Sequence, residues 1–357
     1  MEGVDSQSTW DKTRSDQTIE SGGNVFKHAM KVSIVILCWN DKVVIANCLR
    51  SIYANTRSTE FEVIVSDNGS TDGSVKFIRE HYPLVRVIEN RENLRFAKAN
   101  NIGIRASRGE YILILNPDTI IHDGTLDKLI MFADQNAEAG AFGCRVLNPD
   151  GTYQVSGRPF ASLRREWIAA LYLRPLGHLS DQFSSDTYTG WNGETRRTVD
   201  WLSGCFILVR GELLRRLGGF DEQFFYYYED MDLCHRIWAA GYPIIYTPEM
   251  TIVHLGGQST KRFPTAFALD SQVTRYRYYY KYYGKRGASG ARRVTLASLF
   301  LRRLAYGLIQ SIRPTETLKS RLELFRVLIK WNTRVNPVRL VENGEEPELE
   351  IKSAAPK

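Results

Sequence analysis

The stretch Val32-Ser-Ile-Val-Ile-Leu-Cys38 is a nearly unbroken run of β-branched and apolar residues, and Trp39, Asn40 and Asp41 follow it directly. A run that is apolar on both faces is typical of a parallel strand buried on each side. The polar residues behind it are then at the carboxyl end of that strand. Ligands of open α/β sheets bind at this edge, so the first functional residues are expected there.

The same pattern recurs through the first third of the chain. Further strands are predicted at residues 62–66, 85–88 and 111–115, and helical spacing separates them at residues 43–54, 74–82 and 96–106. Strands that alternate with helices indicate right-handed βαβ units with helices on both faces of the sheet. The predicted fold class is therefore α/β, with a mostly parallel central sheet.

The second half of the chain is less regular. A strand and turn are predicted at residues 140–151, strands at residues 200–210, 244–246 and 251–253, and a helix at residues 229–240 that Gly241 ends. Residues 158–198 form a long, weakly patterned stretch. Loops of this length are often lids or binding segments.

The predicted domain organisation has four parts. Residues 1–30 and 342–357 are expected to be disordered tails, residues 31–270 an α/β domain, which the resemblance described below implies is the catalytic domain, and residues 271–341 a helical arm. With 43% apolar and 24% charged residues, the whole chain is neither disordered nor fibrous. Five scattered cysteines without a C-x-x-C pair favour a reducing compartment. We expect no secretory signal and no membrane-spanning helix.

The positive charge of the chain is concentrated in the arm. Its residues 271–341 hold 16 Lys and Arg against 2 Asp and Glu, whereas the net charge of the whole chain is only +7. Two amphipathic helices are predicted, at residues 292–313 and 318–331. They either lie on an anionic membrane surface, through residues 292–331, or pack on protein, including another copy in a homo-oligomer. A merely solvated basic face is the plainer alternative, and no nucleic-acid module accompanies the charge.

Three polar clusters follow predicted strands, at residues 39–41, 67–70 and 116–118. Several common nucleotide and hydrolase motifs are absent from the sequence. There is no G-x-G-x-x-G after the first strand, no G-x-x-x-x-G-K-[ST] and no G-x-S-x-G. A nicotinamide dinucleotide site, a P-loop and a hydrolase elbow are therefore not expected.

Six motifs occur in a recognisable order over residues 31–265. They are Val32-Ser-Ile-Val-Ile-Leu-Cys-Trp-Asn40, Val65-Ser-Asp-Asn-Gly-Ser-Thr-Asp-Gly-Ser74, Asn93-Leu-Arg-Phe-Ala-Lys-Ala-Asn-Asn101, Gly109-Glu-Tyr-Ile-Leu-Ile-Leu-Asn-Pro-Asp-Thr119, Gly218-Gly-Phe-Asp-Glu-Gln-Phe-Phe-Tyr-Tyr-Tyr-Glu-Asp-Met-Asp-Leu-Cys-His-Arg236 and His254-Leu-Gly-Gly-Gln-Ser259. With these motifs the chain resembles the family 2 glycosyltransferases of the GT-A, or nucleotide-diphospho-sugar transferase, fold. It is most similar to the bacterial branch of rhamnosyltransferases that use a dTDP-activated sugar.

The resemblance implies a set of donor-binding residues. It places Asp67 on the imide N–H of uracil or thymine, although an Asx-turn or helix cap is an alternative use of the same carboxylate. Asn100 could instead bond to its own helix backbone. Arg95 stands where the family often has glycine. The complete expected donor set is Trp39, Asn40, Asp67, Asn93, Arg95, Asn100 and Asn116.

The resemblance also implies a metal site for Mg²⁺ or Mn²⁺. Asp118 matches the second carboxylate of the family's D-x-D element, in which Asn116 occupies the first position. His254 is implied as a further ligand. Both residues have plainer interpretations, since N-P-D is good turn chemistry and a lone histidine is more often structural.

Asp230 is implied as the base that removes the acceptor hydroxyl proton. The alternative is that Glu229, Asp230 and Asp232 only cap a helix, with Asp232 and Arg236 paired at i,i+4. Other residues are expected to bind the acceptor or support the base: Ser203, Gly204, Glu229 and Arg236. Three tryptophans could stack on sugar rings or be core residues: Trp167, Trp191 and Trp201.

The expected activity is metal-dependent, inverting transfer of a sugar. The resemblance suggests L-rhamnose from dTDP-rhamnose, delivered to a lipid-linked or growing surface polysaccharide at the cytoplasmic face of the membrane. A UDP-sugar donor is an alternative with the same mechanism. A nucleotidyltransferase and a non-catalytic scaffold are the two rivals, but the glycine-rich loop of the first is not found after residue 38.

Overall fold

A computed structural model describes residues 30–178, 183–224, 227–256 and 264–344 of the 357-residue chain. The tails predicted at residues 1–30 and 342–357 lie almost wholly outside the described residues. The end of the sixth motif, residues 257–259, lies outside them as well.

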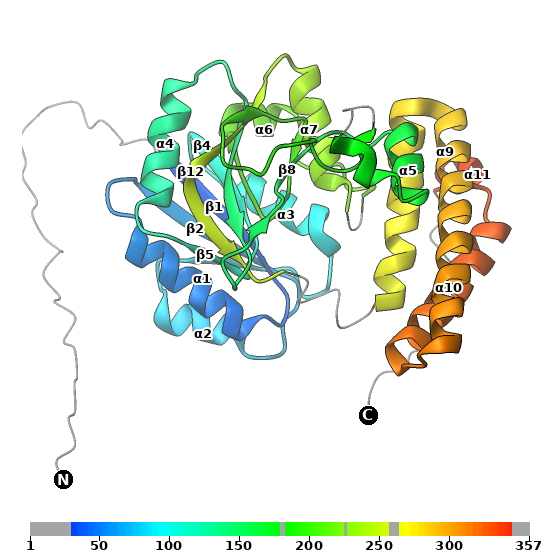
Figure 1. The fold of residues 1–357 in the computed structure, drawn as a ribbon. Helices are drawn as coiled ribbons and strands as arrows, with labels where there is room; N and C mark the ends of the chain where they lie inside the picture. The colour runs from blue at the N-terminus through cyan, green and yellow to red at the C-terminus, as the bar shows by residue number, and fades with distance from the viewer. Residues whose placement is uncertain (1–29, 179–182, 225–226, 257–263, 345–357) are drawn as a thin grey trace, which may run out of the picture.

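A mixed sheet occupies the centre of the catalytic domain (Figure 1), in the strand order β3-β2-β1-β4-β11-β6-β12-β5. The bounds of these strands are β1 (Val32–Cys38), β2 (Phe61–Asp67), β3 (Arg86–Glu89), β4 (Tyr111–Leu115), β5 (Thr119–Ile121), β6 (Ala141–Leu147), β11 (Phe206–Arg210) and β12 (Ile244–His254). Only β11 and β5 run against the common direction. The predicted α/β sheet of mostly parallel strands is therefore confirmed.

Short strands extend this arrangement at one side. β7 (Tyr153–Gln154) pairs with β6, and β9 (Arg197–Thr198) pairs with β12. β8 (Gly157–Arg158) and β10 (Trp201–Leu202) form a separate two-stranded ribbon. These pieces carry the chain from the sheet toward the N-terminus of α7, described below.

Helices cover both faces of the sheet. On one face lie α1 (Lys42–Asn55), α2 (Ser74–His81) and α4 (Thr125–Gln135), and on the other α3 (Arg95–Ala106), α6 (Gly211–Arg216) and α7 (Glu229–Ala239). The two-residue period of a strand explains this division, because Ile34 and Ile36 pack on the α1 side and Val35 on the α3 side. Gly103 of α3 lies so close to Val35 that a Cβ atom there would be 2.5 Å from it.

The secondary structure over residues 32–115 agrees with the prediction, and the rest of the chain differs in instructive ways. The strand predicted at residues 200–210 is broken into β10 and β11, because residues 203–205 turn between them. The strands predicted at residues 244–246 and 251–253 are one strand, β12, whose register shifts between Thr247 and Thr251. Pro248 lies in that shift and has no N–H for the ladder.

Several elements were not predicted. Within the stretch at residues 158–198 lie helix α5 (Leu163–Ala170) and a short 3₁₀ helix, η1 (Arg174–His178). The side chain of Ser162 caps α5 by accepting from the Arg165 N–H. Helix α4 was also missed, although its buried Leu126, Leu129 and Ala133 have helical spacing.

The predicted boundary at residue 270 falls inside helix α9 (Pro264–Ile312). This element changes direction at Gly284, whose φ is 63°, and α10 (Glu316–Arg334) and α11 (Pro337–Glu342) follow it. The helices stand side by side at one edge of the catalytic domain (Figure 1). In the part of the chain that the structure describes, no helix has both the length and the apolar character needed to cross a membrane.

The tyrosine-rich start of the arm attaches it to the catalytic domain. Tyr276, Tyr278 and Tyr279 are fully buried. His235 of α7 stacks between Phe160 and Tyr282, with ring centroids 3.5 and 4.0 Å away. Burial lowers the pKa of His235 to about 4, so this ring is neutral and packs as an aromatic.

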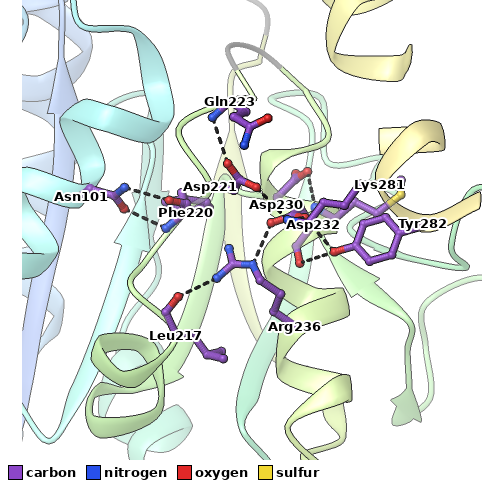
Figure 2. Close-up of polar contacts among 11 residues, drawn as sticks. Asn101, Leu217, Phe220, Asp221, Gln223, Asp230, Asp232, Arg236, Lys281 and Tyr282 are labelled. Atoms are coloured by element: carbon purple, nitrogen blue, oxygen red, sulfur yellow. Dashed lines mark hydrogen bonds and ion pairs between the residues drawn. The ribbon is translucent and has the colours of Figure 1, made fainter. Parts of the chain in front are cut away.

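A buried carboxylate on α7 forms an ion pair with a lysine of the arm (Figure 2). The side chain of Asp232 is fully buried. Its Oδ2 accepts from Arg236 Nε at 2.8 Å, which confirms the predicted i,i+4 pair. Its Oδ1 accepts from Lys281 Nζ at 2.5 Å and from the Tyr282 hydroxyl at 2.7 Å. Because Lys281 and Tyr282 belong to α9, this contact joins the arm to α7.

We predict that Lys281→Met lowers the free energy of unfolding by about 1–3 kcal/mol, because it removes a charged partner from the buried carboxylate of Asp232. Urea denaturation measures this change. Lys285→Met is the matched control, since Lys285 pairs with Glu342 at the surface, where water screens the pair, and its loss should leave the stability almost unchanged. Equal losses in the two variants would contradict the prediction.

Candidate active site

Asp67 at the end of β2 uses its two carboxylate oxygens differently. Oδ2 accepts from the backbone N–H groups of Gly69 and Ser70, each at 3.0 Å. Oδ1 is buried and has no hydrogen-bond partner in the described structure. The Asx-turn that the sequence offered as an alternative is therefore present, but it occupies only one oxygen. The other is a buried acceptor suited to an N–H donor from a ligand.

Asn40 at the end of β1 joins the first two loops at this edge. Its backbone N–H donates to Ser70 Oγ at 2.9 Å, and its Oδ1 accepts from the Thr71 N–H at 2.7 Å. The residue has a φ of 54°, a left-handed conformation that asparagine tolerates. Trp39 is half-buried beside it. The loops after β1 and β2 are thus held as one unit.

Asn68 extends this unit to the loop before α3. Its Nδ2 donates to Asn93 Oδ1 at 3.1 Å and to the Arg95 carbonyl at 3.2 Å. Asn93 and Arg95 line a cavity of about 280 Å³. Asn100 donates to the Phe96 carbonyl at 3.0 Å, the backbone bond that the sequence left open, while its Oδ1 is buried without a partner in the described structure.

The two candidate metal ligands meet at the end of β4 and β12. Asp118 Oδ1 lies 3.2 Å from His254 Nε2, because β12 pairs with β5 and sets His254 opposite Thr119. Gln154 Oε1 is 2.6 Å from His254 Nδ1, which places the ring proton on Nδ1. Nε2 then faces a carboxylate oxygen. A ring nitrogen and a carboxylate oxygen this close can both contact one bound cation.

These residues fit a cation that is shared with a ligand. Among the described residues there is no group of three or more His, Cys, Asp or Glu that could enclose a metal. One carboxylate and one imidazole leave most positions to water and phosphate oxygens, as is usual for Mg²⁺ and Mn²⁺ at nucleotide sites. Asn116 Nδ2 lies 3.3 Å from the same His254 Nε2.

Glu229 and Asp230 begin α7 in different environments. Asp230 Oδ2 accepts from the Gly204 N–H at 2.9 Å, and its Oδ1 accepts from the Met231 N–H at 2.8 Å. Glu229 is 7% exposed, and its Oε2 has no partner in the described structure. Two backbone N–H groups from other residues thus support a charge on Asp230, whereas one oxygen of Glu229 is buried without such a donor in the described structure.

Burial raises the pKa of both carboxyl groups. At Glu229 the nearby charge of Asp230 adds to the rise, and the pKa lies well above its ordinary value. At Asp230 the bonds from Gly204 and Met231 oppose the rise. Burial thus favours the protonated form more strongly at Glu229 than at Asp230, and the raised pKa makes Asp230 a stronger base than an exposed aspartate.

The turn at residues 203–205 connects the candidate base to the candidate metal site. Gly204 binds Asp230, and the Cys205 carbonyl accepts from the Asn116 N–H at 3.0 Å. Ser203 is fixed to the strand ribbon through its N–H, which donates to the Ser156 carbonyl at 2.8 Å. The break in the predicted strand at residues 200–210 is therefore what brings the two sites to one place.

A second cavity, of about 150 Å³, lies beside the start of α7. Trp201, Tyr228 and Met231 line it from one side, and α5 contributes Arg165 and Glu166 from the other. The sequence did not single out these two residues of α5. Their helix is short and isolated from any motif, and the capping Ser162 is the one local signal for it.

Two of the tryptophans and Arg236 do not line either of the two cavities described above. Trp191 stacks edge-on against Tyr246 at 4.7 Å, and Trp167 is 38% exposed on α5. Arg236 binds Asp232 and donates to the Leu217 carbonyl at 3.0 Å, which ties α7 to the end of α6 (Figure 2). A contact of Arg236 with the acceptor stays a prediction.

Comparison with known proteins agrees with this geometry. The family model for glycosyl transferase family 2 matches residues 33–201. An N-acetylglucosaminyl-diphospho-decaprenol L-rhamnosyltransferase of Mycobacterium tuberculosis is 33% identical over 221 residues, which cover 57% of this chain and 69% of that protein. The chain belongs to glycosyltransferase family 2. It is a glycosyltransferase, as the sequence motifs predicted.

Other relatives of this glycosyltransferase agree. Rhamnosyltransferase WbbL of Escherichia coli is 28% identical over 242 residues, which cover 65% of this chain and 86% of that one. The solved structure of a mannosyltransferase from Pyrobaculum calidifontis in complex with GDP-Man and Mn²⁺ has a TM-score of 0.50 and 18% identity, covering 86% and 89% of the two chains. The similarity confirms the GT-A fold.

We predict that the acid limb of the kcat/KM profile lies above the ordinary aspartate pKa of about 4, because burial raises the pKa of Asp230. Activity is lost as the pH falls through that pKa, since the base becomes protonated. Asp230→Asn should reduce kcat by about 10²–10⁴-fold. Glu229→Gln is the control: an amide resembles a protonated carboxyl, so kcat should stay within about tenfold of wild type. The reverse ranking of the two variants would contradict this assignment.

Proposed function

We propose that this glycosyltransferase inverts the configuration of the transferred sugar, with Asp230 as the base. The observation that carries the proposal is the start of α7, where the backbone N–H groups of Gly204 and Met231 each bind one carboxylate oxygen of Asp230. The ionised Asp230 removes the acceptor hydroxyl proton. The acceptor oxygen then bonds to the anomeric carbon, and the bond from that carbon to the nucleoside diphosphate breaks with its electron pair on the leaving oxygen.

The donor is proposed to bind across the ends of β1, β2 and β4. Asp67 Oδ1 accepts the imide N–H of the base, since it is the buried oxygen left over by the Asx-turn. Asn93 and Arg95 lie along the neighbouring cavity and contact the donor from the α3 side. Uracil and thymine present the same imide N–H, so this contact serves a UDP-sugar as well as a dTDP-sugar.

Asp118 and His254 are proposed to hold Mg²⁺ or Mn²⁺ on the donor diphosphate, with Asn116 beside them. Such a cation stabilises the negative charge of the leaving group. Gln154 orients His254 by accepting from Nδ1, which keeps Nε2 directed at Asp118. The complex named for the mannosyltransferase of the same fold contains Mn²⁺, which supports a metal here.

L-rhamnose from dTDP-rhamnose is the donor that we propose, because two relatives are named as rhamnosyltransferases. The acceptor is proposed to be a lipid-linked or growing surface glycan at the cytoplasmic face of the membrane, since one relative's name specifies a diphospho-decaprenol acceptor. The place that we propose for the acceptor is the cavity between α5 and α7, which is lined by Met231, the residue that follows Asp230. A nucleotidyltransferase receives no support from these relatives.

We predict that dTDP-rhamnose with Mn²⁺ or Mg²⁺ raises the melting temperature, since at 100 times Kd a ligand adds about 2.7 kcal/mol to stability. Asp118→Ala should abolish the metal-dependent part of this shift. Asp123→Ala, a change at an exposed carboxylate paired with Arg57, should keep it. A shift with a UDP-sugar and not with dTDP-rhamnose would identify a UDP-sugar as the donor and leave the proposed mechanism unchanged. The absence of a shift with any nucleotide sugar would contradict the proposed donor site.

We also predict inversion at the anomeric carbon, because the site offers one base and the leaving diphosphate needs no protein nucleophile. Proton NMR of the glycan product, compared with the donor, reads this directly. An anomeric configuration equal to that of the donor would exclude Asp230 as a base for direct displacement.

A further inference from the structure

The far end of the α9–α10 pair carries an unusual share of the exposed apolar surface. We define the hairpin tip as residues 300–321, which comprise the end of α9, the turn after it and the start of α10. Of the 15 large apolar side chains that are exposed among the described residues, six lie within its first 13 residues, with 40–77% of each exposed. They are Phe300, Leu301, Leu304, Leu308, Ile309 and Ile312. Contiguous apolar patches on a protein surface commonly mark an interaction site.

These side chains are open because α10 packs on a different face of α9. Tyr306 contacts Phe325 of α10 edge-on at 5.5 Å, and Arg321 Nη1 donates to the Tyr306 hydroxyl. Leu328 and Ile329 of α10 are buried against the same side. The two amphipathic helices therefore have different surroundings. The apolar face of α10 packs on protein, whereas the apolar face of α9 beyond residue 299 is exposed.

Unpaired positive charge accompanies the apolar residues. Arg302, Arg303 and Arg313 are exposed, and no acidic side chain of the described structure pairs with them. The acids nearest in sequence, Glu316 and Glu323, each have their own partner, Lys319 and Arg326. The tip thus exposes both apolar side chains and positively charged side chains, and a partner with apolar and anionic groups would complement both.

We propose that the hairpin tip docks on the surface of an anionic lipid bilayer. The apolar stripe enters the interface between headgroups and acyl chains, and the three arginines bind lipid phosphates. The helix lies on the membrane and does not cross it, which agrees with the absence of a spanning helix among the described residues. A second copy of the chain fits less well, because a two-fold contact would bring the same arginines together.

A groove of about 290 Å³ between α5, α9 and α10 is lined by residues of both the docking surface and the proposed acceptor site. Arg302 of the hairpin tip and Glu166 of α5 both line it, and Glu166 also lines the cavity beside α7. A tip held on lipid therefore presents this side of the molecule to a membrane-borne acceptor, an inference that rests on the proposed function.

Sedimentation with vesicles tests the proposal on the full chain. The protein should co-sediment with vesicles of phosphatidylethanolamine and phosphatidylglycerol, and much less with phosphatidylcholine alone. The triple variant L304E/L308E/I312E should lose at least tenfold in partition coefficient, and R302Q/R303Q should lose about tenfold on anionic vesicles at low salt. The control L84E/M131E introduces glutamate at two exposed apolar residues outside the tip. This variant should bind vesicles like wild type.

Two results would overturn the proposal. One is equal vesicle binding by wild type and the triple variant. The other is a wild-type dimer in light scattering that the triple variant converts to a monomer, with no vesicle binding by either, which would assign the tip to a contact between copies. Activity separates this test from the proposed function: the triple variant should keep wild-type turnover on a water-soluble acceptor and lose it on an acceptor embedded in vesicles. Vesicle binding by a protein without rhamnosyl transfer would refute the proposed donor and leave the docking surface intact.

Discussion

The central strands of the sheet are buried on both faces, and this constraint decides where chemistry can occur. A strand such as β1 has no exposed face for a polar side chain, so apart from the buried and hydrogen-bonded Ser33 its polar residues come where the strand ends. Asp67 and Asn116 follow the same rule at the ends of β2 and β4. Parallel strands end at one edge, so the loops behind them meet there. Asn40 and Asn68 then bind those loops to one another through side-chain hydrogen bonds.

Three acids in the first turn of α7 illustrate how environment separates identical chemistry. One carboxylate oxygen of Glu229 is buried without a hydrogen-bond donor in the described structure, and burial raises the pKa of this residue well above its ordinary value. Asp230 receives two backbone N–H groups. Asp232 is paired with Arg236 and Lys281. Of the three acids, Asp230 is therefore the one whose charge backbone N–H groups support on both oxygens, and the next residue, Met231, lines the cavity beside α5. The arm contributes to this difference among the three acids, because Lys281 of α9 pairs with the buried carboxylate of Asp232.

The arm has two regions with different physics. Around Tyr276–Tyr279 it is part of the protein core, with fully buried rings and hydrogen bonds to α5. Beyond residue 299 the same α9 helix is apolar toward the outside. An amphipathic pattern states that a helix has an apolar face, but it does not name what covers that face. The patterns at residues 292–313 and 318–331 were similar in sequence, and the position of α10 gave them different surroundings.

Local patterns in the sequence determined the parallel half of the sheet, the order of its helices and the polar residues at strand ends, because periodicity and loop chemistry act over a few residues. Helix α4 could have been found by the same means. The antiparallel half, the joining of two predicted strands into β12 and the helix α5 depended on distant partners. The tertiary structure alone brought His254 to Asp118, gave Asp67 one bound and one unbound oxygen, and paired Lys281 with Asp232. These outcomes depend on burial and on contacts between residues far apart in the chain, which no short stretch of sequence contains.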